Sequence, residues 1–471
     1  MSKSLTPPSR ISPSCRWWLL AGLALFIIVA LLCILVLVPA SVRALPGRYA
    51  ARLPDFIQDL RRRPHPDLLP TPAIAVTPLT LLTPTALRLG GVTFATPTKS
   101  ERTLTPTTSK PTSQPTLTPT SLSLVPGPSS QTPTPTPTSS PAPTSIPTSI
   151  SIPISISIPP PITHTYQTWN NCGPATLSIA MSHLRRTETQ ADAAAYLKPD
   201  PEDKNVSPYE MAAYARSLGL EATVRVGGDL TRLKQLIAGG FAVLIETWFI
   251  PEPDDQMGHY RLLTGYDDAR GQFISQDSYN GPNVRVDYAP LDELWLVFNR
   301  IYLIVYHPSQ AGQLAAILGD DVHDKTMYTR ALEAAHGEAT SPSAGCVAYK
   351  DCADRAAFAW FSVGSSLTSL GRHQEAVGAY DQARLLGLPW RMLWYQFGPY
   401  ESYYAVGRYD DVIILATATL DACDNLEESY YWRGMAYLDQ GERDRARDDF
   451  KRALKYNPNF SAAAKALDEL E

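Results

Sequence analysis

The sequence predicts an α+β domain in the middle of the chain, followed by an all-α array of helical repeats. Helix signals precede strand-like runs between residues 162 and 307, which indicates an α+β domain. Similar helical units recur over residues 356–471. Residues 43–161 are rich in Pro, Thr and Ser. At 471 residues, the chain is long enough for two or three folded units joined by linkers.

The N-terminal part consists of a short tail, residues 1–18, and an apolar run. No charged residue lies between Trp17 and Val42. The run is long enough to cross about 30 Å of hydrocarbon as a helix. We therefore expect residues 19–42 to form a transmembrane helix that binds the protein to a membrane. A cleaved signal peptide is the alternative, although the run is longer than the apolar region of a normal signal peptide.

Two signals for the orientation of this helix disagree. More basic residues follow the apolar run than precede it, and this count favours a cytoplasmic C-terminal part. The Pro/Thr-rich sequence behind the run is typical of an extracytoplasmic stalk. On that ground we expect a single-pass protein of the cell membrane, with its C-terminal domains outside the cytoplasm.

Residues 43–161 are expected to form a disordered linker, because they offer few large apolar side chains for a core. Thr-Pro repeats such as those at residues 131–137 favour an extended polyproline conformation. At about 3.1 Å per residue, the stretch from Pro70 to Pro161 spans on the order of 200 Å. It is either a spacer of functional length or a linker without a length requirement.

The charge and the cysteine spacing of the chain indicate which ligands and partners are not expected. The formal net charge is only -5, and no cluster of Lys and Arg interleaves with aromatic residues, so we do not expect nucleic-acid binding. The six cysteines lack zinc-site spacing, and no metal or organic cofactor is implied. Cys346 and Cys352 bracket a short loop and form either a disulfide or two separate thiols.

Local signals place the helices of the α+β domain. Residues 175–184 read as a helix behind Gly173-Pro174. A capping box at residues 207–210 starts a second helix that runs to about Leu218. Asp229 caps a third helix, which Gly239-Gly240 ends. Asp292 and Glu293 read as the solvated start of a further helix.

Apolar, β-branched and aromatic runs place the strands after these helices. The predicted strands cover residues 241–249, 259–266, 272–276 and 301–306. Asp267 and Asp268 fall in the turn between two of them and are expected to shape that turn. A connecting helical segment is predicted for residues 308–355.

The C-terminal region shows internal repetition. Gly371, Gly407 and Gly441 recur at intervals of about 34 residues in similar turns. Around these turns, the first and third units share the residue pattern Gly364, Ala376, Tyr380, Ala383, Pro389 and Gly434, Ala446, Phe450, Ala453, Pro458. Residues 356–471 resemble tetratricopeptide repeats. The resemblance implies a surface for a protein or peptide partner, and the alternative is that the helices only pad the preceding domain.

Cys172 is the candidate nucleophile, in the string Gln167-Thr168-Trp169-Asn170-Asn171-Cys172-Gly173-Pro174. A thiol at the start of a helix lies at the positive end of the helix dipole, which favours the thiolate. Gln167 lies upstream, where its amide can join the Cys172 backbone N–H in binding an oxyanion. A lone cysteine is otherwise most often a small buried apolar residue.

His259 and Asp277 supply the partners that a thiolate nucleophile requires. His259 opens one predicted strand, and Asp277 follows the next strand of the same hairpin. The two positions fall nearly opposite each other, so a carboxylate can reach the imidazole. The remaining histidines considered lack such a setting, and surface or linker roles are expected for His164, His183, His307 and His323.

These motifs together resemble the C39-like cysteine peptidase family of the papain-like superfamily, over residues 162–307. The matching positions are Gln167, Cys172-Gly173-Pro174, Gly258-His259-Tyr260, Gly265-Tyr266-Asp267-Asp268 and Asp277. The resemblance implies a papain-like fold with Cys172 as nucleophile, His259 as general base and acid, Asp277 as orienting group and Gln167 as oxyanion donor.

The chain departs from the family pattern in two ways, and these limit which properties of the family are expected of it. Asn171 stands where relatives often have aspartate, with no expected effect on the chemistry. The better-known members are fused to exporters and cleave leader peptides, and this chain has no exporter, so leader cleavage is not carried over. The sequence therefore predicts a peptide or amide hydrolase with a peptide or protein substrate. Transfer to an amine, and an inactive surface adaptor, are the alternatives.

Overall fold

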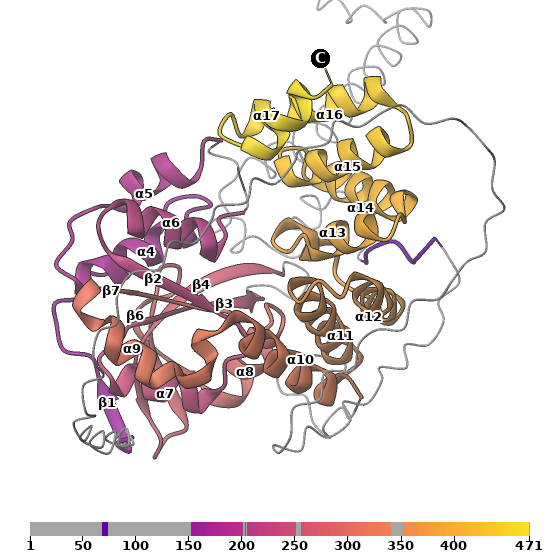
Figure 1. The fold of residues 1–471 in the computed structure, drawn as a ribbon. Coiled ribbons are helices and arrows are strands. Elements are labelled where there is room, and N and C mark those ends of the chain that lie inside the picture. Colours follow the sequence, from indigo (N-terminus) through magenta and orange to yellow (C-terminus); the bar gives the residue numbers. More distant parts are fainter. Residues whose placement is uncertain are drawn as a thin grey trace, which may run out of the picture. The chain divides into compact units, whose positions relative to one another are not determined.

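The computed structural model describes residues 68–73, 152–200, 203, 205–250, 256–340 and 352–470 (Figure 1). The expected transmembrane helix at 19–42, most of the expected linker, and the side chains of Cys346 and Cys352 lie outside this set. Within it, no helix has both the length and the hydropathy needed for a membrane crossing.

Residues 152–306 form a mixed domain in which helices pack on a sheet that has seven strands among the described residues. The strands are β1 Ser155–Ser157, β2 Glu221–Arg225, β3 Val243–Phe249, β4 Met257–Asp267, β5 Gln272–Asp277, β6 Gly281–Asp287 and β7 Tyr302–Tyr306. The helices are α4 Cys172–His183, α5 Gln190–Leu197, α6 Pro208–Ser217, α7 Leu230–Ala238 and α8 Tyr288–Leu296.

The sheet is antiparallel throughout, in the order β2-β7-β3-β4-β5-β6. Strand β4 lies between β3 and β5, and its register sets Thr247 opposite His259 and Leu262 opposite Gln276. Beyond the start of β3, β1 pairs with the last residues of β4. The sheet thus holds the end of β4 that carries His259 next to the end of β5 that carries Asp277.

The predicted helix boundaries rest on capping groups that the structure contains. Ser207 and Glu210 form a reciprocal capping box at the start of α6. The Asp229 carboxylate accepts the Arg232 N–H at the start of α7, and Gly239 caps its other end. These local predictions are confirmed because each depends on hydrogen bonds within one turn of the chain.

Other predictions need correction. The order of helices first and strands afterwards is wrong in detail, because β2 lies between α6 and α7. Strand β6 was also missed. Residues 155–157 were assigned to the disordered linker, but they form β1, since β4 offers them a free backbone edge beyond β3. Glu293 is not solvated: it is buried inside α8, where Arg355 pairs with it at 3.3 Å.

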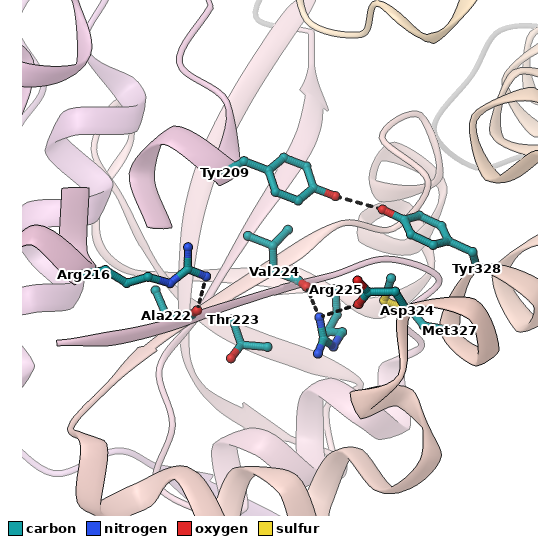
Figure 2. Close-up of a pocket in the computed structure, with 9 residues that line it drawn as sticks. All are labelled: Tyr209, Arg216, Ala222, Thr223, Val224, Arg225, Asp324, Met327 and Tyr328. Carbon is teal, nitrogen blue, oxygen red and sulfur yellow. Dashed lines mark hydrogen bonds and ion pairs between the residues drawn. The ribbon is translucent and has the colours of Figure 1, made fainter. Parts of the chain in front are cut away.

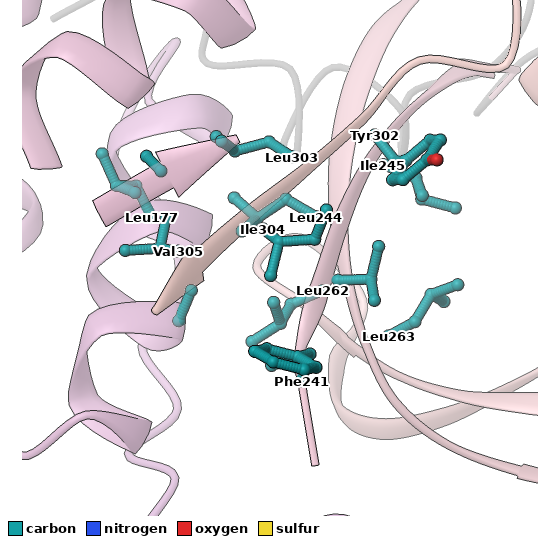
Figure 3. Packing of buried hydrophobic residues seen from close by; sticks show 14 of the residues in the cluster. Leu177, Phe241, Leu244, Ile245, Leu262, Leu263, Tyr302, Leu303, Ile304 and Val305 are labelled. Carbon is teal, nitrogen blue, oxygen red and sulfur yellow. The ribbon is translucent and has the colours of Figure 1, made fainter. Parts of the chain in front are cut away.

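The core of the mixed domain fills the space between the sheet and the helices that pack on it. Figure 3 shows Leu244, Leu262 and Ile304, from three neighbouring strands, gathered in this core. Leu177 of α4 belongs to the same cluster and is fully buried. Apolar burial of this kind fixes α4 on the sheet, and with it the position of Cys172 at the start of the helix.

Helical elements follow the mixed domain (brown to yellow at the C-terminal end of Figure 1). The connecting segment contains η2 Pro308–Gln310, α9 Ala311–Leu318, η3 Gly319–Val322 and α10 Asp324–Thr340. The repeat region contains α11 Cys352–Ser369, α12 His373–Leu386, η4 Trp390–Trp394, α13 Gly398–Ala405, α14 Tyr409–Ala422, α15 Glu427–Asp439, α16 Arg443–Tyr456 and α17 Ser461–Asp468.

The packing expected of the repeats is present. Gly371, Gly407 and Gly441 take the positive φ angles of 70°, 77° and 82° at which glycine meets no steric penalty. A Cβ placed on Gly434 would stand 2.7 Å from the ring of Phe450, so only glycine lets these helices approach so closely. The small and aromatic residues of the pattern thus serve helix packing.

The repeat region also contacts the mixed domain through hydrogen bonds. The Ser362 hydroxyl donates to the Leu296 carbonyl at 3.0 Å, and the Gln396 amide donates to the Val297 carbonyl at 2.9 Å. Arg391 donates to the carbonyl of Gln256, just before β4, at 2.9 Å. These contacts connect the repeats to the end of α8 and to the start of β4.

Candidate active site

Cys172 is the first residue of α4 and is partly buried. Gly173, next to it, lets Val206 and Tyr260 approach, because a Cβ there would stand 3.3 Å from Val206 Cβ. Burial raises the pKa of the Cys172 thiol, but a hydrogen bond from His259 and the charge of its imidazole outweigh burial. The net pKa lies below its ordinary value, which favours a thiolate.

His259 lies between this thiol and a carboxylate. Its Nε2 is 2.9 Å from Asp277 Oδ1, and the two side chains are only 3% and 1% exposed. Because Asp277 occupies Nε2, Nδ1 is the ring nitrogen left for Cys172. Burial lowers the pKa of His259, but the hydrogen bonds with Asp277 and Cys172 raise it above its ordinary value overall. The geometry suits a thiolate–imidazolium pair.

Asp277 is surrounded by hydrogen-bond donors. Arg261 Nε donates to Oδ2 at 3.0 Å, and the Asn280 side chain donates to the same oxygen at 2.9 Å. The backbone N–H groups of Tyr279 and Asn280 donate to Oδ1, each at 2.9 Å. Burial raises the pKa of Asp277, but His259 and these donors hold it well below its usual range. The carboxylate is therefore fixed both in charge and in orientation.

Phe249, at the end of β3, packs over the imidazole of His259. Their ring centroids are 4.8 Å apart, and the Arg261 guanidinium lies 5.9 Å from the centroid of the same phenyl ring. The Tyr279 ring meets Phe249 edge-on at 5.2 Å. These aromatic contacts restrict rotation of the imidazole and exclude water from one side of it.

Gln167 is held against the residue that follows Asp277. Its N–H donates to the Ser278 carbonyl at 2.9 Å, and the Ser278 hydroxyl donates to Gln167 Oε1 at 2.8 Å. Because Oε1 is engaged, Nε2 is the end of the amide left as a donor.

The structure brings together side chains of Cys172, His259 and Asp277, and it ties Gln167 to the Asp277 loop. Sequence reasoning missed Arg261 and Asn280. A signal for Arg261 was present, since it lies two positions after His259 and alternate residues of a strand share a face. Asn280 follows Asp277 by three residues in a turn, a position where an amide often bonds locally.

Two further titratable groups lie near the site: Glu246, which sequence reasoning missed, and His164, for which a surface or linker role is expected. Glu246 on β3 is buried, and burial together with the nearby Cys172 charge raises the pKa of its carboxyl well above normal. His164 is half-buried and meets Tyr166 edge-on at 4.9 Å. Burial lowers the pKa of His164, while Gln276 and Asp277 act in the opposite direction. His164 therefore lies nearer this site than a linker role implies.

A cavity of about 250 Å³ lies between α6 and β2 of the mixed domain and α10 of the connecting segment (Figure 2). Its lining includes Tyr209 and Tyr328, whose hydroxyls are 3.1 Å apart. The lining contains none of the four residues predicted for catalysis, and it has no thiol. We therefore place the candidate active site at Cys172. In the described part of the chain, no three His, Cys, Asp or Glu side chains converge as a metal site.

Comparison with known proteins agrees with the resemblance read from the motifs. Residues 160–302 match the model of the Peptidase_C39 like family, and residues 427–460 match that of the tetratricopeptide repeat. No curated protein matched the chain.

Solved structures of similar proteins include two peptidases. One is a double glycine motif protease from an AMS/PCAT transporter, in complex with the leader peptide. It is 18% identical, over 32% of this chain and 94% of that chain, with a TM-score of 0.24. The other is described as a C39-like peptidase from Bacillus anthracis, and it is 15% identical over 33% of this chain and 95% of that chain, with a TM-score of 0.25.

Proposed function

We propose that this chain, which carries a C39-like peptidase-family domain followed by a tetratricopeptide-repeat region, is a cysteine peptidase that hydrolyses a peptide or amide bond. One observation carries the proposal. His259 Nε2 and Asp277 Oδ1 are 2.9 Å apart and buried, and they face the Cys172 thiol at the start of α4. His259 lowers the pKa of this thiol. A cysteine with only a packing role needs neither partner.

The reaction proceeds through a thioester. Cys172 Sγ attacks the carbonyl carbon, and the oxyanion is bound by the Cys172 backbone N–H and Gln167 Nε2. The imidazolium of His259 then protonates the leaving amine from Nδ1, and the C–N bond breaks. Water attacks the thioester while His259 takes up its proton, and the carboxylic acid leaves with the thiol regenerated. Asp277 keeps the ring in the required tautomer and supports its positive charge.

The experiment that tests this proposal uses the full chain and an electrophilic thiol probe. Cys172 should react fast near pH 7, where an ordinary thiol with a pKa of about 8.5 reacts slowly. The fast-reacting site should disappear in Cys172→Ala and persist in Cys423→Ala, which removes a thiol buried in the repeats. Labelling of Cys172 no faster than a small-molecule thiol would instead favour an inactive adaptor.

We further place the protein at the cell membrane, anchored through residues 19–42, with its folded domains outside. The apolar run without charges and the Pro/Thr-rich sequence behind it support this topology. Added protease should cut the repeat region of intact cells. Cleavage of the repeats only after lysis would reverse the orientation.

The repeats are proposed to bind a protein or peptide partner, and the substrate is proposed to be a peptide or protein. Repeats of this type expose extended helical faces beyond those needed to support one another. A test is capture of a bound peptide from a defined peptide library by the full Cys172→Ala chain, followed by loss of capture on substitution of exposed repeat residues.

A further inference from the structure

A short extended segment, residues 68–73, lies against the repeat region. Leu68 forms an isolated antiparallel bridge with Pro389. The Leu69 N–H donates to the Leu388 carbonyl at 2.8 Å, and the Leu69 side chain is only 4% exposed. The segment contacts the turn after α12 at positions more than 300 residues away in the sequence.

The next residues of the segment meet a buried ion pair between α12 and α14. Arg384 donates from Nε to the Pro70 carbonyl at 2.8 Å and from a terminal nitrogen to the Thr71 carbonyl at 2.9 Å. Its other terminal nitrogen donates to Asp411 Oδ1 at 2.8 Å, and that same oxygen accepts the Ala73 N–H at 3.1 Å. One guanidinium and one carboxylate therefore bind the backbone of the segment at three positions, Pro70, Thr71 and Ala73.

Contacts within the repeat region hold much of this site. Arg384 and Asp411 are nearly fully buried, and the Arg384 guanidinium lies 5.2 Å from the centroid of the Tyr403 ring. Asp411 also accepts from Arg408 at 2.7 Å. A guanidinium fixed on one side by a carboxylate and an aromatic ring has little rotational freedom left to lose when a peptide binds.

The segment has the chemistry that such a site selects. Pro70 and Pro72 have no N–H, so neither position leaves an unsatisfied donor when its neighbours are bound. Proline also favours the extended conformation in which the carbonyls of Pro70 and Thr71 reach Arg384. Gly387 accommodates the first leucine, because a Cβ there would stand 3.2 Å from Leu68 Cδ1.

We propose that the repeat region contains a peptide-binding site, formed by Leu388, Arg384 and Asp411, and that residues 68–73 are its ligand in the same chain. The site binds an extended peptide in which a buried leucine is followed by prolines. Arg384 and Asp411 recognise its backbone through hydrogen bonds. Release of the segment opens the site to a second peptide of the same kind.

This docking changes the role of the Pro/Thr-rich sequence. Ala73 is held by Asp411, and Ile152 packs against the core of the mixed domain, so both ends of the sequence between them are fixed. If residues 19–42 span a membrane, as proposed above, residues 43–67 alone then set the distance of the folded part from it. This consequence rests on the proposed anchor, whereas the docking itself does not.

Hydrogen exchange of the full chain tests the docking. The Leu69 and Ala73 amides should exchange more slowly than the same amides in an unstructured peptide, on the order of tenfold or more. Leu69→Asp places a charge at the buried anchor and should abolish this protection. Ile154→Asp is the control, since Ile154 is 72% exposed and lies outside the segment, and it should retain the protection.

A labelled synthetic peptide of residues 66–75 tests the site itself. It should bind the Leu69→Asp chain and fail to bind the wild-type chain at micromolar concentration, because a tethered ligand competes at an effective concentration of about millimolar. Adding Arg384→Lys to the Leu69→Asp chain should weaken peptide binding, since lysine cannot donate to three acceptors from a fixed plane.

Either of two results would overturn the proposal. One is exchange of residues 68–73 in the wild-type chain at the rate of an unstructured peptide. The other is a lack of any difference between the wild-type and Leu69→Asp chains in binding the labelled peptide, whether both bind it or neither does. The thiol-probe assay of Cys172 is independent of both, so failure of the proposed peptidase function would be recognised separately.

Discussion

The ring of Tyr395, from the repeat region, packs against Gly258, the residue that precedes His259 in β4. A Cβ placed on Gly258 would stand 3.1 Å from Tyr395 Cε1, so the two residues are in close contact. Trp248 of β3 meets the Tyr395 ring at right angles, with centroids 6.4 Å apart. The strand end that carries His259 is thus supported by the repeats.

We expect Tyr395→Ala to slow labelling of Cys172, because removal of the ring leaves a void behind the strand that positions His259. It should also lower the free energy of unfolding, by up to about 4 kcal/mol. The measurements are the rate of thiol-probe labelling and thermal unfolding. Tyr395→Phe keeps the ring and should change the labelling rate much less.

Tyr404→Ala is a control for this prediction. Tyr404 contacts Tyr409 and Trp432 inside the repeat region. Its loss should destabilise the repeats without slowing the labelling of Cys172. Equal slowing by Tyr404→Ala and Tyr395→Ala would mean that general destabilisation, and not the contact with Gly258, limits the reaction.

His259→Ala should move the pH dependence of thiol labelling upward. In the native protein the hydrogen bond and charge of His259 bring the thiol pKa below its ordinary value, against the effect of burial. Without the imidazole, the largest effect that opposes burial is lost, so the thiol pKa rises and the thiolate fraction near pH 7 falls. The check is labelling rate against pH. His183→Ala, at the other end of α4, should leave the profile unchanged, and an unshifted profile for His259→Ala would contradict the proposed pair.

Asp277→Asn should lower the rate of Cys172 labelling near pH 7, and it should lower peptidase turnover by roughly 10²- to 10⁴-fold once a substrate is known. The amide cannot support the imidazolium charge, although it keeps the size of the side chain. Arg261→Gln should also lower the labelling rate and the turnover, but by less, because His259 and Asn280 still bind the Asp277 carboxylate.

The stability contributed by Asp277 should also depend on pH. Its folded-state pKa lies well below the unfolded value of about 3.9. The ionised carboxylate therefore stabilises the fold above about pH 4, and this contribution is lost as the pH falls below that value. Asp277→Asn should accordingly reduce the unfolding temperature most at neutral pH and progressively less in acid. A constant difference across the range would contradict this linkage.

Asp203→Asn should stabilise the protein at high pH. Asp203 is buried, and burial together with Glu427 of the repeat region raises its pKa to about 8. The neutral carboxyl is tolerated below the unfolded pKa of about 3.9, and stability is lost as the pH rises from there through the folded pKa. The variant and the wild type should unfold alike near pH 4.

The difference should grow to roughly 2–4 kcal/mol near pH 9, because asparagine cannot ionise. Thermal or denaturant unfolding across this range provides the measurement. Asp448→Asn, on the exposed face of α16, is the matched control and should show no such trend. An equal increase in the free energy of unfolding of Asp203→Asn at pH 4 and pH 9 would show that the ionisation of Asp203 is not the cause of the stabilisation.

Local sequence signals were sufficient for much of the fold. The capping box at Ser207 and the glycine turns of the repeats act within a few residues, so their patterns specify geometry directly. The positions of Cys172, His259 and Asp277 also followed from local context, namely a helix start and the two sides of one hairpin. Strands β2 and β6 did not, because short strands with alternating exposure carry a weak signal until a neighbouring strand pairs with them.

The sequence by itself determined the order of the units, the main helix boundaries and the residues worth testing, because these depend on propensity, capping and period. Only the tertiary structure decided that β1 joins β4, that Tyr395 supports Gly258, and that residues 68–73 occupy a site formed by Arg384 and Asp411. Each of these contacts joins segments far apart in the chain. Their free energy comes from burial and from hydrogen bonds that exist only after the separate elements have packed, and no local pattern encodes it.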